Sequence, residues 1–249
     1  MPTPIRDATW AQIEALRDGL TRDLPATRTL ATAAQLFVER LVGGFASVAL
    51  ARVFHVTALR RLPSDVQADA AAFASSAGRT VPLDASTPVL TLMGTAGDEP
   101  AWNDRTRSEG HRAIPLVDKR LVDGAPMIAA LLAGLDVELA PLEVNGPIQL
   151  RFLSGGINAR FYVPDARTTK DARGRLIIAN EPFVANHGIR TVFGMGGAFL
   201  DGSLIASILF TREELSAAEV DRFPSFIGTF KIATGPLVEA GALLTSSTS

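Results

Sequence analysis

The sequence predicts an α+β domain, with a mostly antiparallel central sheet flanked by N- and C-terminal helices and carrying a large insertion. Helical periods occupy both ends of the chain, and apolar strands separated by turns and long loops lie between them. This order differs from the strict strand–helix alternation of a doubly wound fold. A chain of 249 residues with 47% hydrophobic side chains is long enough to bury a substantial core.

Two amphipathic helices are expected at the start of the chain. In residues 8–22 apolar side chains recur every three or four positions, with Asp7 as the expected N-cap. Pro25 ends this period, and residues 27–42 resume it until the glycines at positions 43 and 44.

The middle of the chain is expected to supply the sheet and its insertions. Alternating or β-rich segments predict strands over residues 45–59, 87–97, 148–153 and 159–166. Helices are expected over residues 64–77 and 126–134. The clearest hairpin signal is the Asp201-Gly202 pair between two apolar runs in residues 190–210.

The end of the chain predicts a closing helix over residues 215–240. Ser216 and Glu219 have the spacing of a capping box, and Pro224 is expected near a kink or break. We therefore expect one domain over residues 1–249, divided into a helical entry (8–42), the sheet and its insertions (45–210) and the closing helix (215–240).

Composition narrows the classes of function. A net charge of −2 disfavours a nucleic-acid partner or an anionic membrane surface. The absence of cysteine excludes disulfides, thiolate metal sites and thiol nucleophiles. No apolar run approaches the roughly 18 residues of a spanning helix, and no signal-peptide pattern opens the sequence, so we expect a cytoplasmic protein.

Residues 98–116 concentrate hydrogen-bonding side chains in an otherwise apolar chain. The guanidinium groups in this segment suit carboxylate or phosphate, Trp102 suits a flat group, and His111 suits protonation or metal binding. The candidate ligand-binding residues here are Trp102, Asn103, Arg105, Ser108, His111 and Arg112. The alternative is a surface loop that satisfies its own polar groups, with Trp102 against the edge of the core.

A second candidate group lies just before the predicted hairpin. Asn186, His187 and Arg190 are expected to join the site if this segment faces the cavity. The alternative is a tight turn at Asn186-His187-Gly188, which local turn chemistry favours. His55 follows Phe54 in a predicted strand and is expected to be a buried strand histidine rather than a ligand.

The last third of the sequence resembles a known family. A strand, a glycine turn, a strand ending "ILF" and then "TREELSAAEVDRF" leading into a long helix resemble the end of a GAF domain. Segments "GHRAIPL", "FYVPDA" and "FVANHGIRTVFGMGG" are similar to an input region found beside bacterial sensor kinases. This resemblance implies a small-molecule sensor of bacterial signal transduction, a homodimer formed through its terminal helices, and a signalling-protein partner.

Two other functions stay open at this point. One is a hydrolase or isomerase that uses the 98–116 loop with His111 as base, although no nucleophile-elbow or His-Glu-x-x-His motif occurs. The other is a ligand-free dimerisation module. The cofactor is unknown: zinc is disfavoured without cysteine, and haem held by one axial histidine is an open alternative.

Overall fold

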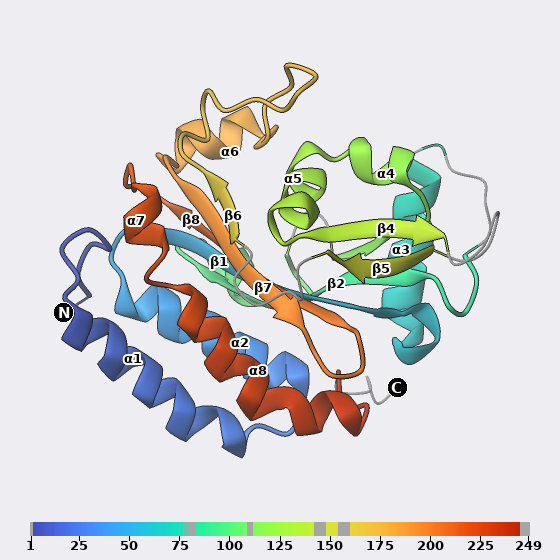
Figure 1. The fold of residues 1–249 in the computed structure, drawn as a ribbon, viewed down its shortest axis with the longest axis horizontal. Coiled ribbons are helices and arrows are strands. Elements are labelled where there is room, and N and C mark those ends of the chain that lie inside the picture. Colours follow the sequence, from blue (N-terminus) through green and yellow to red (C-terminus); the bar gives the residue numbers. More distant parts are fainter. Residues whose placement is uncertain are drawn as a thin grey trace.

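An antiparallel sheet forms the centre of the structure, a computed structural model that describes residues 2–76, 78, 83–108, 112–141, 148–153 and 160–244. Within these residues the sheet has six strands in the order β3-β2-β1-β8-β7-β6 (Figure 1). They are β1 (Val48–Ala58), β2 (Pro88–Gly97), β3 (Ala113–Pro115), β6 (Arg160–Val163), β7 (Val192–Ala198) and β8 (Leu204–Thr211). Every neighbouring pair is antiparallel, which confirms the predicted α+β class.

Helices from the two ends of the chain cover one face of this sheet. They are α1 (Trp10–Asp23), α2 (Leu30–Gly44) and α8 (Pro224–Glu239), which form one layer (Figure 1). Phe37 of α2 and Phe230 of α8 are fully buried and meet edge to face, with ring centroids 5.0 Å apart. They share a core with Val53 of β1 and Leu209 of β8, so this layer is fastened to the two central strands.

Helix α2 approaches the sheet unusually closely at Gly94 of β2. A Cβ atom at this position would lie 2.5 Å from the backbone carbonyl carbon of Ala34, which is inside van der Waals contact. Only glycine therefore lets α2 lie at this depth on the strand.

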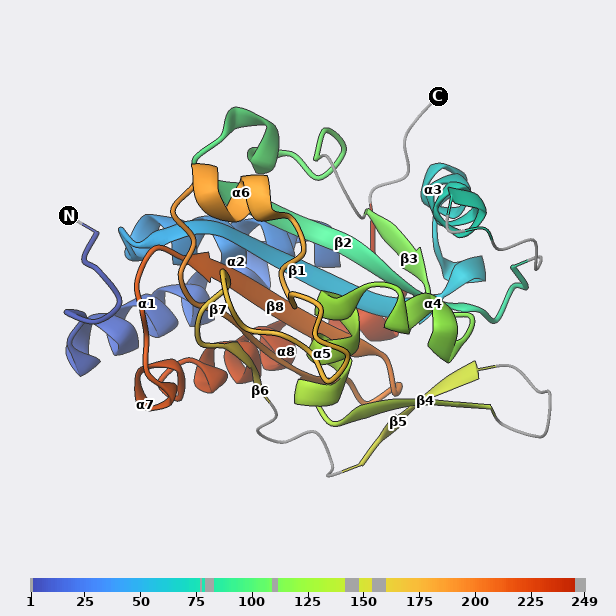
Figure 2. The ribbon, with the colours of Figure 1, turned by 90° about the horizontal axis from the view of Figure 1, so that it is seen from above.

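The opposite face of the sheet carries a second core. Helices α5 (Pro126–Gly134) and α6 (Glu181–Asn186) lie over it, together with a two-stranded sheet of β4 (Val137–Pro141) and β5 (Ile148–Phe152) (Figure 2). Leu131 of α5 packs in one cluster with Leu50 of β1 and Ile208 of β8. The remaining elements are η1 (Leu24–Ala26), η2 (Leu59–Arg61), α3 (Ser64–Ser76), η3 (Pro100–Asn103), α4 (Lys119–Asp123) and α7 (Ala217–Val220).

Strand β1 contributes to both cores because its side chains alternate between the two faces. Ala51 and Val53 join the core under the helices, whereas Leu50 and Phe54 join the opposite core. Arg52 is the charged residue in this second row.

Some local predictions hold and others are wrong. The Asp201-Gly202 hairpin is confirmed between β7 and β8, with Gly202 at φ +78°. The expected cap Asp7 is wrong: the Thr9 side chain accepts from the Gln12 backbone N–H in a capping box, and Asp7 lies in the preceding turn. The break expected near Pro224 is confirmed: α7 ends at Val220, and Pro224 occupies the first turn of α8, where its missing N–H costs little.

The end of the chain returns to the start of α2. The backbone N–H groups of Leu30 and Ala31 donate to the carbonyl oxygens of Ala242 and Leu243, at 2.8 and 2.9 Å. Because first-turn N–H groups have no partner inside their own helix, these contacts satisfy two of them. The large insertion and the boundaries of the single domain stay predictions.

Candidate functional site

A cavity of about 1300 Å³ lies on the face of the sheet opposite the helical layer. Its floor is formed by Leu50 and Arg52 of β1 and Phe210 of β8. Its walls come from four separate parts of the chain, namely Phe73 and Gly78 and residues within 99–102, 120–128 and 177–187. The volume exceeds the roughly 300–1,000 Å³ of a common small-molecule site. Exposed residues such as Glu99 and Arg120 form its rim, so the cavity opens to solvent.

Arg52 is the unusual residue of this floor. Its Nη2 donates to Ser108 Oγ at 3.0 Å, while its Nε is buried without a hydrogen-bond partner. No carboxylate among the described residues forms an ion pair with Arg52. Burial lowers the pKa of this guanidinium to about 10. A charge that is partly removed from water in this way is costly unless something neutralises it.

One wall of the cavity is aromatic. The Trp102 ring lies edge-on to Phe183, with centroids 5.6 Å apart, and to His187, with centroids 4.5 Å apart. Phe183 also meets Phe210 edge to face at 5.3 Å, which joins this wall to the floor. Such a cluster offers flat apolar surface together with the polar edge of one imidazole.

Trp102 is held in place by its neighbours in the chain. The side-chain amide of Asn103 donates to the carbonyl oxygens of Gly97 and Glu99, and its oxygen accepts from the Gly97 N–H, each at 3.0 Å. A Cβ at Gly97 would lie 2.8 Å from a ring carbon of Trp102, so the indole packs directly on the strand backbone. Asn103 thus acts by positioning and does not line the cavity.

The charges around the cavity favour an anion. Its lining carries the guanidinium groups of Arg52 and Arg120 but one carboxylate, Glu99. The Glu99 Oε1 lies 4.0 Å from His187 Nδ1, a contact that becomes an ion pair only when the imidazole is protonated. The first residues of α5 also line the cavity, and this helix begins at Pro126 without a side-chain cap. A helix N-terminus carries partial positive charge.

The structure distributes the candidates of residues 98–116 among different roles. Trp102 lines the cavity, and Ser108 contacts Arg52. Arg112 lies outside the lining: it pairs with Asp69 at 2.6 Å and donates to the Thr106 carbonyl at 2.8 Å. Arg105 also lies outside it, and burial is the main cause that lowers its pKa. His111 lies outside the described residues, so its proposed role as a base stays a prediction.

The candidates near the hairpin are likewise divided. His187, a predicted ligand-binding candidate, lines the cavity at the end of α6, although local turn chemistry favoured the alternative of a tight turn. Asn186 is exposed, and Arg190 pairs with Glu214 at 3.2 Å; neither lines the cavity.

His55 lies away from this cavity and is fully buried. Its Nε2 lies 3.0 Å from Ser203 Oγ, which is itself 2.5 Å from a carboxylate oxygen of Asp201. If the hydroxyl donates to the carboxylate, the imidazole must donate to the hydroxyl oxygen through Nε2. Burial lowers the pKa of His55 to about 3, so the ring is neutral at physiological pH.

Sequence reasoning missed Arg52, the most informative residue of the cavity. Its signal is its position between Leu50 and Phe54, in the middle of a strand that is buried along nearly its whole length. A charged side chain in such a row, even one that is only partly buried, is uncommon when no carboxylate faces it.

Neither a metal-binding cluster nor a membrane-spanning helix is found in the described part of the chain. No cluster of three or more His, Cys, Asp or Glu side chains suited to a metal ion occurs there. No helix in that part combines the length and apolar character needed to cross a bilayer.

Comparison with known proteins shows similarity in three-dimensional arrangement. No protein-family model matches the sequence, and no curated protein is significantly similar to it. The GAF domain of a phosphoenolpyruvate-protein phosphotransferase from Coxiella burnetii is similar over 94% of this chain and 99% of that chain, with 11% identity and a TM-score of 0.49. The corresponding GAF domain from Acinetobacter is similar over 96% and 99%, with 12% identity and a TM-score of 0.46.

Photoreceptor structures are similar in the same way. The phycoerythrobilin-bound GAF domain of a cyanobacterial phytochrome matches 93% of this chain and 99% of that chain, with 8% identity and a TM-score of 0.45. A bacteriophytochrome from R. palustris matches 94% of this chain, with 11% identity and a TM-score of 0.44, and the chain spans 39% of its length. Several of the solved structures that are similar to this chain are GAF domains.

Proposed function

We propose that this chain is a cytoplasmic sensory domain of bacterial signal transduction that binds a small molecule in the cavity beside Arg52. The observation that carries the proposal is the cavity itself. It is open, has a volume of about 1300 Å³, and combines a buried guanidinium with an aromatic wall. Concave sites with mostly apolar walls and a few placed polar groups are typical of small-molecule binding.

The two faces of β1 supply a route from the ligand to the helices. Arg52 faces the cavity, and its neighbours Ala51 and Val53 pack in the core that contains Phe37 of α2. A ligand that binds one position of this strand more tightly shifts the population toward the matching arrangement of helices. That shift is the signal that a partner protein would detect.

Binding is tested first on the freshly purified protein by native mass spectrometry and absorption spectroscopy. A retained mass identifies a tightly held ligand, and a Soret band identifies haem, for which His187 is the imidazole among the described cavity residues. A protein without either is screened by thermal shift against organic acids and nucleotides.

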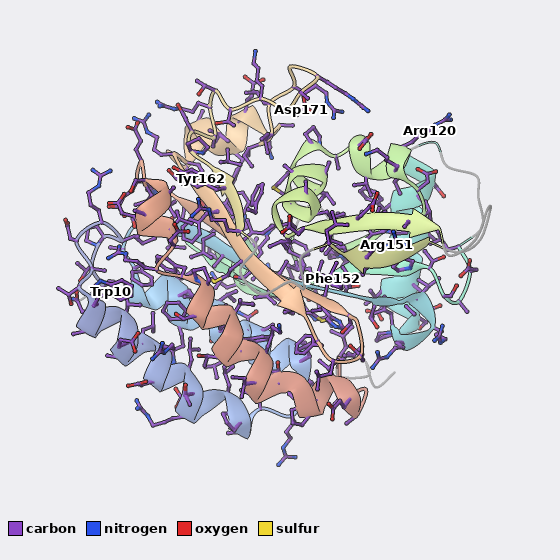
Figure 3. The ribbon with its side chains drawn as sticks, in the orientation of Figure 1. Trp10, Arg120, Arg151, Phe152, Tyr162 and Asp171 are labelled. Atoms are coloured by element: carbon purple, nitrogen blue, oxygen red, sulfur yellow. The ribbon has the colours of Figure 1, made fainter. Side chains whose placement is uncertain are left out.

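The controls use the two tryptophans of the chain. Trp102→Ala should abolish the thermal shift of a compound bound in the cavity. Trp10→Ala should preserve it, because Trp10 lies on the helical layer at the opposite end of the molecule from Arg120 of the rim (Figure 3). A thermal shift that survives Trp102→Ala unchanged would place binding elsewhere and contradict the proposal.

We further propose a homodimer formed through the terminal helices. Trp10 of α1 is 62% exposed and Ile232 of α8 is 84% exposed, which leaves apolar side chains on the outer surface of both helices. Light scattering after size-exclusion chromatography should give twice the mass of one chain, and Ile232→Lys should reduce the measured mass to that of a single chain. A monomer at micromolar concentration would contradict this part of the proposal.

A further inference from the structure

We infer that the ligand is an organic anion, with a carboxylate or phosphate that pairs with Arg52 and a flat apolar body that lies against Trp102 and Phe183. This inference rests on the proposed function, since it names the class of molecule that enters the same cavity.

The anionic group follows from the unmet charge of Arg52. A guanidinium carries five N–H donors, and the structure gives this one a single hydrogen bond, to the neutral hydroxyl of Ser108. Two arginines of the candidate loop differ in this respect: Arg112 forms an ion pair with Asp69, and the carboxylates of Asp65 and Asp104 offset the charge of Arg105. A guanidinium without such a carboxylate is suited to bind the carboxylate or phosphate of a ligand.

The remaining charges of the cavity have the matching sign. Arg120 stands on the rim without an ion pair among the described residues, and the uncapped N-terminus of α5 adds partial positive charge. The carboxylate of the lining, Glu99, lies on the His187 side of the aromatic wall. The described lining therefore carries more positive than negative charge, which favours an anion over a cation beside Arg52.

The flat body follows from the aromatic wall. Trp102, Phe183 and Phe210 form a continuous series of edge-on contacts at 5.6 and 5.3 Å. The Trp102 ring lies on the backbone of Gly97, and Asn103 fixes its segment, so this surface is formed before a ligand arrives. Preorganised aromatic surface binds planar apolar groups at a low entropic cost.

The experiment uses two probes that differ only in charge. These are 8-anilinonaphthalene-1-sulfonate and N-phenyl-1-naphthylamine, which share the aromatic body but only the first of which carries an anionic group. The protein carries Trp10→Phe, so that the quenching of Trp102 emission reports binding in the cavity. Arg52→Met is compared with Arg52→Lys, which keeps the charge, and with Arg151→Gln, which removes an exposed charge from β5. Circular dichroism confirms that each variant is folded.

We expect both probes to quench Trp102 in the Trp10→Phe protein. Arg52→Met should weaken the sulfonate probe about 10- to 100-fold, the range for loss of a charge-assisted hydrogen bond, and should leave the neutral probe within about twofold. Arg52→Lys should fall between these limits, and Arg151→Gln should change neither probe. Competition by benzoate and by phenyl phosphate then ranks the two oxyanions.

Two negative results have different meanings. If Arg52→Met weakens both probes equally or weakens neither, the guanidinium does not select for the anionic group, and the inferred anionic class is overturned while the proposed function stands. If neither probe changes Trp102 emission in the Trp10→Phe protein, the cavity takes no ligand of this size, and the proposed function itself is overturned.

Discussion

Replacing Arg52 by methionine should stabilise the free protein. The methionine side chain is apolar and resembles the aliphatic part of arginine in length, so it can fill the space between Leu50 and Phe54 without a charge. Burial lowers the pKa of Arg52 to about 10 in the folded state. Because the folded protein holds the proton less tightly than the unfolded chain does, the penalty is present in full below pH 10 and is relieved as the pH rises above 10.

The magnitude follows from the size of this shift. Because burial lowers the pKa of Arg52 to about 10, well below its ordinary value, its charge is disfavoured in the folded state by about 3 kcal/mol at neutral pH. The substitution also removes the hydrogen bond to Ser108, which is worth about 1 kcal/mol. We therefore expect the free energy of unfolding to rise by about 2 kcal/mol, or roughly 4 to 8 °C in Tm for a chain of this size.

Urea unfolding followed by far-ultraviolet circular dichroism at pH 7.5 measures this difference. Arg151→Gln is the matched control, because it removes a positive charge from an exposed position and should stay within about 0.5 kcal/mol of the parent. If Arg52→Met proves less stable than the parent, the guanidinium is neutralised in the free protein. In that case Arg52 would not be an unpaired charge that is available to an anionic ligand.

Three more outcomes are expected from other parts of the fold. Because burial holds the pKa of His55 near 3, against 6.5 in the unfolded chain, the free energy of unfolding should fall as the pH drops through 6.5, by about 2 kcal/mol at pH 5. In urea titrations the His55→Asn variant should lose this dependence on pH, whereas the His187→Asn control should keep it. Loss of the dependence in the control would disprove the assignment to His55. Asn103→Ala should red-shift Trp102 emission and weaken probe binding several-fold, and an unchanged spectrum would show that the amide does not position the indole. Gly94→Ala should cost about 1–3 kcal/mol by overpacking against α2, and calorimetry showing an unchanged Tm would contradict the close approach.

The parts of the fold that sequence predicts well are those governed by local chemistry. The hairpin between β7 and β8 needs a residue at positive φ in its turn, and Asp201-Gly202 supplies it within a few residues of the strands it joins. The capping box of Ser216 and Glu219 is confirmed for the same reason, since both partners lie in one turn of helix.

Two elements were missed although they are local. Strand β4 was not expected, although it pairs with β5 only a few residues further along the chain and the Asn145-Gly146 pair between them is a hairpin signal that was overlooked. Helix α6 was not expected either: it is six residues long, too short for a helical period to be recognised, and its cap Asn180 also suits a turn.

The candidate site shows the same division. Trp102 could be selected from its loop as a large aromatic residue among polar ones, and it does line the cavity. Arg105 and Arg112 were selected by the same reasoning, but whether an arginine faces a ligand or a neighbouring aspartate depends on α3, which lies far away in the sequence. Arg52 was overlooked because the sequence does not show which side chains surround it, and the lack of a carboxylate partner among the described residues is visible only in the folded structure.

Hydrogen bonds join residues 242–243, which follow α8, to the first turn of α2. Ala242 and Leu243 supply acceptors to the first turn of a helix that begins more than two hundred positions earlier, and that helix rests directly on Gly94 of the sheet. A pull on this tail would first break two hydrogen bonds at the entrance of α2 and fray its leading turn, while the hairpins of the sheet stay paired. These two hydrogen bonds thus hold the first turn of α2 in place, and faster hydrogen exchange at the Leu30 and Ala31 amides would show that they have broken.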